Sequence, residues 1–243
     1  MKKFLSKIRR RETPFFIALY DAAFRLKRIN MPCFFLPLYR WIAFVRLGLI
    51  HSGRRIIAFI YYEPMFRSMC EQVGKNLNYV KTRQGFPYFH GPICIFLGEN
   101  VTVHGRMALS AASLLNDPRF IVGNSTYLGP GLSISVCKEI SIGKSCLIAS
   151  NVTISDNDGH PIDPIKRAKG ESIDLEDVSP VRIGNNVWIG DGTIVLKGVS
   201  IGDGSIVGAR SVVNSDIPPH SIAVGNPAKI VKKVSNFPYN QFQ

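Results

Sequence analysis

The sequence predicts a mainly β protein, built as a parallel β-helix that follows a basic, aromatic-rich helical segment at the N-terminus. Three observations predict this fold. Aliphatic residues recur every six positions in the C-terminal part of the chain, glycines occur in phase with them, and both features begin after about residue 72. The 243 residues, of which 46% are hydrophobic, suffice for a continuous buried core.

The N-terminal segment, residues 1–72, combines apolar clusters with positive charge. It contains fourteen Lys and Arg residues against four Asp and Glu residues, so it carries ten of the thirteen excess positive charges. Its apolar clusters are separated by Arg, which favours short helices, and no apolar run reaches the roughly 20 residues of a membrane span. Two interpretations of residues 1–66 follow: a helical segment at an anionic membrane surface, or a cap or oligomer contact on the main domain.

The six-residue period is clearest near the C-terminus. Six aliphatic residues follow one another there at constant spacing, and Gly comes directly after four of them: Ile183, Ile189, Val195, Ile201, Val207 and Val213, with Gly184, Gly190, Gly202 and Gly208. Shorter runs upstream keep the spacing but slip in register: Leu97, Val103, Leu109; Val122, Leu128, Ile134; and Val136, Ile142, Ile148, Ile154.

A period of six is wrong for an α-helix and too regular for a β-sandwich, but it is typical of a solenoid in which each hexad forms one short strand and one turn. The aliphatic side chain then points to the axis, a small residue occupies the bend, and stacked coils align the aliphatic residues into a ladder. We therefore expect a β-helix over residues 73–234, followed by a tail at 235–243.

The stretch Ile-Gly-Asn-Asn-Val-Trp-Ile-Gly at 183–190, continued to Lys229, resembles the hexapeptide-repeat acetyltransferases, in particular their galactoside, maltose and polysaccharide O-acetyltransferase branch. The strong resemblance covers residues 140–234, and a weaker one extends back to residue 73. It implies a left-handed β-helix, contrary to the usual right-handed crossover, a homotrimer, and acetyl-CoA as co-substrate.

A polar loop, residues 155–180, interrupts the repeat, and loops of this kind commonly carry function. Its Gly-His-Pro at 159–161, with Arg167 seven residues after the His, matches the family pattern. The resemblance implies that His160 is the general base that takes a proton from the acceptor during direct transfer.

Three further residues are candidates for binding the acceptor: Asp158, Arg167 and Trp188. Each has a structural alternative, namely a solvated loop carboxylate, a loop salt bridge and a subunit-interface residue. Asp163 is, with Asp158, a candidate to orient the imidazole.

The family's coenzyme A contacts fall on six positions: Asp191, Ala209, Asn214, Ser215, Lys229 and Lys232. The two lysines would meet phosphates where family members often carry Arg. One departure concerns the acceptor, because Cys137 occupies the place of a substrate-binding Asp in galactoside-type enzymes. A free simple galactoside or maltose is therefore disfavoured as substrate.

These observations predict an acetyl-CoA-dependent O-acetyltransferase acting on a sugar hydroxyl, of a surface polysaccharide or its lipid-linked precursor. The alternatives are an N-acetyltransferase of an amino sugar or xenobiotic, and a non-catalytic β-helix scaffold. We expect no metal, because a zinc site needs about three converging histidines and the other histidines lie far from His160 in the sequence. No nucleic-acid-binding motif accompanies the positive charge.

Five cysteines occur without a C-x-x-C pair, which favours reduced core thiols over disulfides or a nucleophile. The basic N-terminus lacks the continuous apolar stretch of a signal peptide. We therefore expect a cytoplasmic enzyme, at the inner face of the membrane where the N-terminal segment binds lipid.

Overall fold

The computed structural model of the chain describes residues 14–15, 17–18, 36–80, 85–111 and 117–234. Two compact units, residues 1–52 and 53–243, are each described by themselves. Cys33, the expected tail at 235–243 and most of residues 1–35 lie outside the described residues.

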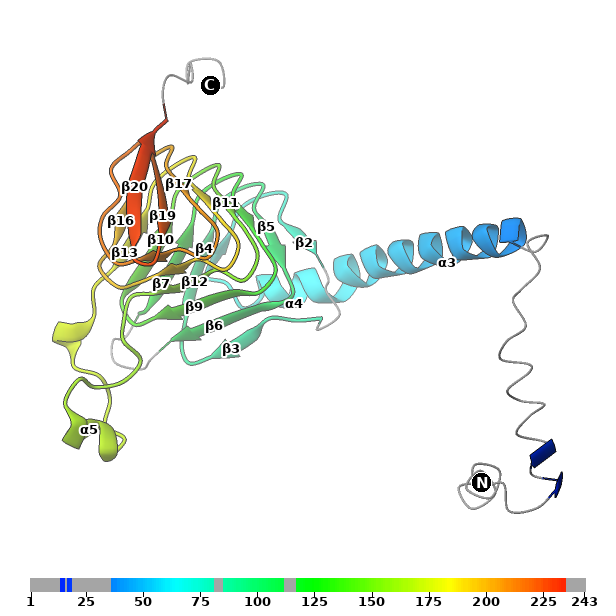
Figure 1. Ribbon diagram of the computed structural model, residues 1–243, viewed down its shortest axis with the longest axis horizontal. Coiled ribbons are helices and arrows are strands. Elements are labelled where there is room, and N and C mark those ends of the chain that lie inside the picture. The colour runs from blue at the N-terminus through cyan, green and yellow to red at the C-terminus, as the bar shows by residue number, and fades with distance from the viewer. Residues whose placement is uncertain (1–13, 16, 19–35, 81–84, 112–116, 235–243) are drawn as a thin grey trace. The chain divides into compact units, whose positions relative to one another are not determined.

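The second unit contains three parallel sheets that wind around one core (Figure 1). Sheet A contains β1 (Gln72–Val73), β4 (Cys94–Leu97), β7 (Arg119–Val122), β10 (Glu139–Ile142), β13 (Val181–Ile183) and β16 (Ser200–Ile201). Sheet B contains β2 (Asn78–Val80), β5 (Thr102–His104), β8 (Tyr127–Leu128), β11 (Leu147–Ile148), β14 (Trp188–Ile189), β17 (Ile206–Val207), β19 (Ser221–Gly225) and β20 (Ala228–Lys233), the last two antiparallel. Sheet C contains β3 (Tyr88–His90), β6 (Met107–Ala111), β9 (Leu132–Val136), β12 (Thr153–Ser155), β15 (Ile194–Val195) and β18 (Val212–Val213). The chain passes from A to B to C in each coil, as in the left-handed β-helix that the resemblance implies.

The six-residue period is confirmed, because its residues form the inner ladder of each sheet. On sheet A the ladder pairs Leu97 with Val122, then Ile142, Ile183 and Ile201, and all five are at most 3% exposed. Apolar burial of about 25 cal/mol per Å² along this continuous core is the main stabilising contribution.

All the upstream slips in the six-residue register occur at the same place in the fold, where the chain passes from sheet C to sheet A. Within each coil from β4 onward the ladder residues of sheets A, B and C are six apart, whereas the steps from sheet C to sheet A vary: 13 residues from Leu109 to Val122, eight from Ile134 to Ile142, and 29 from Ile154 to Ile183. The insertions therefore stack along one edge, the C/A edge. The longest of them holds α5 (Pro164–Ala168) and the 3₁₀ helix η3 (Leu175–Asp177).

Glycine after the aliphatic residue is explained by the close stacking of the bends. A Cβ on Gly143 would lie 2.6 Å from the backbone of Gly184 in the next coil, and one on Gly190 would lie 2.5 Å from the nitrogen of Ala209. Only Gly allows this approach without moving a neighbouring coil.

The expectation of several short helices is wrong for the described part of the N-terminal segment. A single helix, α3 (Leu36–Ile57), continues directly into the π-helical turn η2 (Ala58–Tyr62) and α4 (Glu63–Arg67). The Arg residues within it are compatible with a helix. The wider π turn ends two residues before Pro64, whose ring would otherwise meet the carbonyl four residues earlier. None of the described helices combines the length and apolar character needed to cross a membrane.

The end of this helix closes the N-terminal end of the β-helix core. Phe66 is 1% exposed and its ring contacts those of Tyr79, Phe86 and Phe89 at 5.7, 6.5 and 6.2 Å, while the Tyr62 ring stacks on Tyr79 at 6.1 Å. This aromatic cluster covers the apolar end that a solenoid would otherwise expose.

Candidate active site

The loop that carries His160 is fixed at its base by a buried carboxylate. Asp156 follows β12, is fully buried, and accepts hydrogen bonds from the backbone nitrogens of Cys137, Lys138 and Glu139 at 2.7, 2.7 and 2.9 Å. The residue thereby joins the loop to the corner between β9 and β10. Charge-assisted bonds of this kind are about twice as strong as neutral ones.

The next residue orients the chain toward His160. The amide nitrogen of Asn157 donates to the carbonyl and hydroxyl oxygens of Ser135 at 3.1 and 3.2 Å, and its amide oxygen accepts from the nitrogen of Gly159 at 2.9 Å. Gly159 has φ of +77°, a value that suits glycine. His160 is therefore presented from a base tied to sheet C.

His160 lies at a pocket of about 450 Å³ between this loop and the C/A edge. The loop contributes Asn157 and Glu171, and the outer face of sheet C contributes His90, Ser110 and Ser135. Pockets of a few hundred Å³ with a few convergent polar groups are typical of small-ligand sites.

The sheet side of the pocket is a row of small polar residues. Parallel register aligns His90 with Ser110, Ser110 with Ser135, and Ser135 with Ser155 on the outer face of sheet C. Two residues earlier on the first of these strands, Tyr88 is 64% exposed and its ring stacks parallel to that of His90 at 6.4 Å. Small hydroxyls beside an exposed aromatic ring suit a sugar, which has both polar edges and apolar faces.

A second pocket, of about 320 Å³, lies on the same outer face of sheet C, two residues earlier on its strands, and is lined by Tyr88, Arg106, Ala108 and Ser133. Ala108 and Ser133 are each two residues from a serine of the first pocket, so both pockets face the same strip of sheet C. The strip offers room for more than one sugar unit.

Cys137, the departure from the family pattern, has a structural role. It is 1% exposed and forms a small apolar cluster with Ile173 and Val178 of the loop. A carboxylate at this position would lie beside the buried Asp156 without water, which is costly for like charges. The cysteine thus belongs to the anchoring of the loop.

The predicted acceptor residues on the loop are engaged with the loop itself. The carboxylate of Asp158 pairs with Lys197, which also donates to the carbonyl of Asp177 at 2.8 Å. Arg167, on α5, donates to the carbonyls of Pro161 and Ile162 at 2.9 and 3.0 Å.

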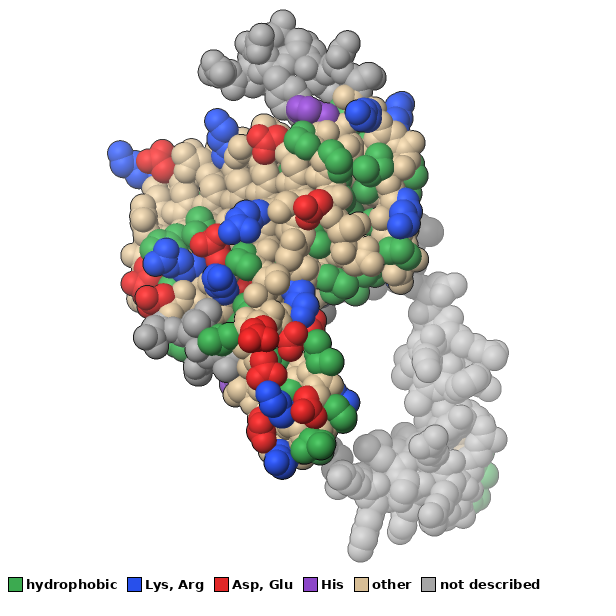
Figure 2. All heavy atoms as spheres, turned by 90° about the vertical axis from the view of Figure 1, so that its left-hand side faces the viewer, with side chains coloured by type: hydrophobic (Ala, Val, Ile, Leu, Met, Phe, Trp, Pro, Cys, Tyr) green, Lys and Arg blue, Asp and Glu red, His purple; other side chains and the backbone are tan. Residues whose placement is uncertain are grey.

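The outer part of the loop is also polar and internally bonded. Asp163 accepts from the nitrogen of Ile165 at 2.7 Å and caps α5. Lys166 donates to Asp174 at 2.8 Å, and this bond holds the pKa of Lys166 above its ordinary value. Figure 2 shows the resulting cluster of acidic and basic side chains on the lobe formed by this loop.

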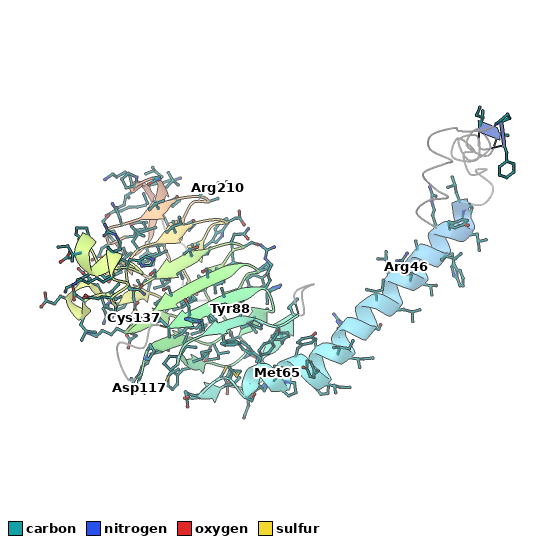
Figure 3. All side chains as sticks on the ribbon, turned by 90° about the horizontal axis from the view of Figure 1, so that it is seen from below. Arg46, Met65, Tyr88, Asp117, Cys137 and Arg210 are labelled. Atoms are coloured by element: carbon teal, nitrogen blue, oxygen red, sulfur yellow. The ribbon has the colours of Figure 1, made fainter. Side chains whose placement is uncertain are left out.

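None of the predicted coenzyme A positions lines the His160 pocket within one chain. Asp191 and Ala209 occupy the corner between sheets B and C, while Lys229 and Lys232 are exposed on β20. Asn214 and Ser215 follow β18 at the C-terminal end of sheet C. Figure 3 shows Arg210, next to Ala209, on the other side of the β-helix from Cys137.

Trp188 faces outward, as predicted, but on sheet B rather than beside the loop. It is 50% exposed and stands in register between Leu147 and Ile206, in an outward row that also contains Tyr127. Within one chain it does not share a pocket with His160.

Sequence reasoning missed His90, which was taken to lie far from His160. The signal that could have found it is the ladder itself, since coils of 20 to 25 residues place His90, Ser110, Ser135 and Ser155 at one register position. Across the described ranges, no group of three or more His, Cys, Asp or Glu residues is placed to hold a metal ion.

Known proteins with the same repeat are similar to this chain in sequence. Residues 180–215 match the family described as bacterial transferase hexapeptide (six repeats). The chain is 36% identical to the galactoside O-acetyltransferase of Escherichia coli K12 over 140 residues, which are 58% of this chain and 64% of that relative. It is 32% identical to a maltose O-acetyltransferase from Clostridium difficile 630 over 72% of this chain and 75% of that one, with a TM-score of 0.43.

A further solved structure is similar in fold. It is a mutant of the N-acyltransferase AntD from Bacillus cereus in complex with dTDP-4-amino-4,6-dideoxyglucose and coenzyme A, 20% identical, covering 72% of this chain and 89% of that one, with a TM-score of 0.55. Fold and repeat together are those of a hexapeptide-repeat β-helix, into which a loop carrying His160 is inserted. The chain thus resembles the hexapeptide-repeat acetyltransferases, most clearly over residues 180–215, and it spans just under two thirds of the length of its curated galactoside relative.

Proposed function

We propose that the protein is an acetyl-CoA-dependent O-acetyltransferase that acts on a sugar hydroxyl of a surface polysaccharide or its lipid-linked precursor. The observation that carries the proposal is His160 at the edge of a sugar-sized pocket, beside the row of small hydroxyls on sheet C. The identity with a galactoside O-acetyltransferase supports the same reaction class.

The proposed reaction is a direct transfer. Neutral His160 takes the proton of the acceptor hydroxyl while its oxygen attacks the thioester carbonyl, the carbon–sulfur bond then breaks, and the imidazolium returns the proton to the thiolate of coenzyme A. General base catalysis of this kind contributes about 10²–10⁴ in rate. Burial raises the pKa of the Cys70 thiol to about 12 and also raises that of Cys146, which disfavours a thiolate nucleophile at either position.

We propose further that the donor site is completed by a second copy of the chain. Asp191 and Ala209 lie at the B/C corner and His160 at the C/A edge, so the two sets are separated by the width of sheet C within one chain. A homotrimer with grooves between adjacent copies would bring them together, with Asn214, Ser215, Lys229 and Lys232 toward the coenzyme A phosphates.

We also propose that Asp158, Arg167 and Trp188 act on the acceptor mainly by shaping its site, since the first two hold the loop. The proposed location is the cytoplasm.

The test is acetyl transfer from acetyl-CoA to a panel of cell-envelope glycans that includes both hydroxyl-only and amino sugars, measured as released coenzyme A and as acetylated product. We expect His160→Ala to lower kcat by 10²–10⁴-fold, because the proton of the attacking hydroxyl loses its acceptor.

The matched control is His220→Asn, which changes an exposed histidine of the terminal turn and keeps a residue that tolerates its φ of +56°. A His160→Ala enzyme with more than a tenth of wild-type turnover would contradict the role of His160. Products acetylated only on nitrogen would replace O-acetylation with the N-acetyltransferase alternative.

A further inference from the structure

Helix α3 carries an apolar stripe that no described residue of its own unit covers. Leu38, Trp41, Ile42, Val45 and Leu49 follow the helical spacing of three and four residues and therefore share one side. They are 37 to 69% exposed, with Trp41 at 63%. Exposed stripes of this size mark interaction surfaces.

The charge around the stripe is of one sign. At about 100° per residue, Arg40 projects from the side opposite to the stripe, and Arg46 and Arg55 flank it on its two sides. Residues 22–62 contain seven Lys and Arg residues and no Asp or Glu. Such a helix repels a second copy of itself and attracts a polyanionic surface.

Helices that combine an apolar stripe with flanking cations lie in the plane of a membrane interface, with the rings among the head groups and the cations at the phosphates. The Arg residues disfavour a deeper position, because each costs about 2.5–3.5 kcal/mol at the centre of a bilayer. We infer that α3 binds the surface of an anionic lipid bilayer through the stripe Leu38–Leu49 and its flanking arginines. This inference goes beyond the proposed reaction and does not depend on it.

The experiment is flotation of the full-length protein with vesicles of phosphatidylcholine alone and of equal parts phosphatidylcholine and phosphatidylglycerol. We expect binding to the anionic vesicles only. The double variant Arg46→Glu, Arg55→Glu should weaken that binding by at least about 30-fold, since each flanking cation near the surface contributes about 1 kcal/mol. The variant Leu38→Ser, Leu49→Ser should weaken it as well, because it removes apolar burial and leaves the charge unchanged.

The matched control is Lys75→Glu, Lys144→Glu, which makes the same change of charge at two exposed turns of the β-helix. It should retain most of the binding. Equal loss in the control and in the arginine variant would reduce the effect to net charge and overturn the assignment to α3.

Two other outcomes would also overturn it. One is equal binding to neutral and anionic vesicles. The other is unchanged vesicle binding in both α3 variants together with a lowered mass in solution, which would make the stripe a contact between copies. Coenzyme A release is not used as a readout, so a failure of the proposed reaction would leave this test intact.

Discussion

At the scale of single residues, the site depends on polar groups that the fold brings together from distant parts of the chain. His90 and His160 are 70 positions apart, yet both line one pocket. The serines between them give that part of the pocket small, polar side chains. His90 is therefore a candidate for holding the acceptor in the proposed reaction, in which His160 takes the acceptor's proton.

The variant His90→Ala should raise the KM for a glycan acceptor about tenfold, because a neutral hydrogen bond and a stacking surface contribute about 1–2 kcal/mol. Hydrolysis of acetyl-CoA without acceptor should stay at the wild-type rate. His104→Ala, on sheet B, is the control. A fall in both acetyl transfer and acetyl-CoA hydrolysis would show that His90 acts on the fold rather than on the acceptor.

Some residue roles are readable from the sequence and others only from the contacts. The position of His160 on a loop was predictable, because its Gly-His-Pro segment falls where the six-residue repeat is interrupted. Arg167 and Asp158 could not be assigned in the same way. Their charges bond to loop carbonyls and to Lys197 respectively, and the sequence does not state which of several nearby partners a flexible charged side chain meets.

At the scale of elements, the bends are as restrictive as the strands. Gly143 and Gly184 stack at successive corners, and the backbone of one lies where a side chain of the other would be. The strands themselves are two to five residues long through most of the β-helix, so their stability depends on this stacking.

The substitution Gly143→Ala should destabilise the β-helix by about 1–3 kcal/mol and lower its melting temperature, because a Cβ 2.6 Å from the next coil forces the coils apart. The control is Gly48→Ala on α3, where nothing lies within 4 Å of the added Cβ. Alanine there should leave the β-helix melting temperature unchanged. A Gly143→Ala protein that melts with the wild type would contradict the role of this close approach.

The ladder was predictable because each aliphatic residue repeats the same physical requirement at a fixed interval. The insertions at the C/A edge were not, since parallel pairing of β10 with β13 imposes no length on the chain between them. The run beginning at Val136 spans two coils, because Val136 lies on β9, where it pairs with Ala111, whereas Ile142 lies on β10. The long helix was missed because Arg interrupts an apolar run without interrupting a helix.

At the scale of the whole molecule, one outer face is unusually apolar. Tyr127, Leu147 and Trp188 stand in register on sheet B and are 36, 45 and 50% exposed. Such a row gains free energy when another copy of the chain covers it.

We expect a particle of roughly 81 kDa, three times the 27.0 kDa chain, by light scattering after size exclusion. Leu147→Asp should convert it to the monomer mass, because a charge is then buried in the contact. Lys144→Asp, at the adjacent exposed turn, should remain a trimer. A wild-type monomer would refute the shared donor site.

The direct pairing of Ile142 with Ile183 has a consequence for how this protein can change over time. Because β10 and β13 pair directly, the length and sequence of the loop between β12 and β13 can change while the hydrogen bonds between β10 and β13 are kept. In the proposed enzyme, acceptor preference could therefore change without loss of thermal stability, and exchanging residues between these two strands is a way to test that separation.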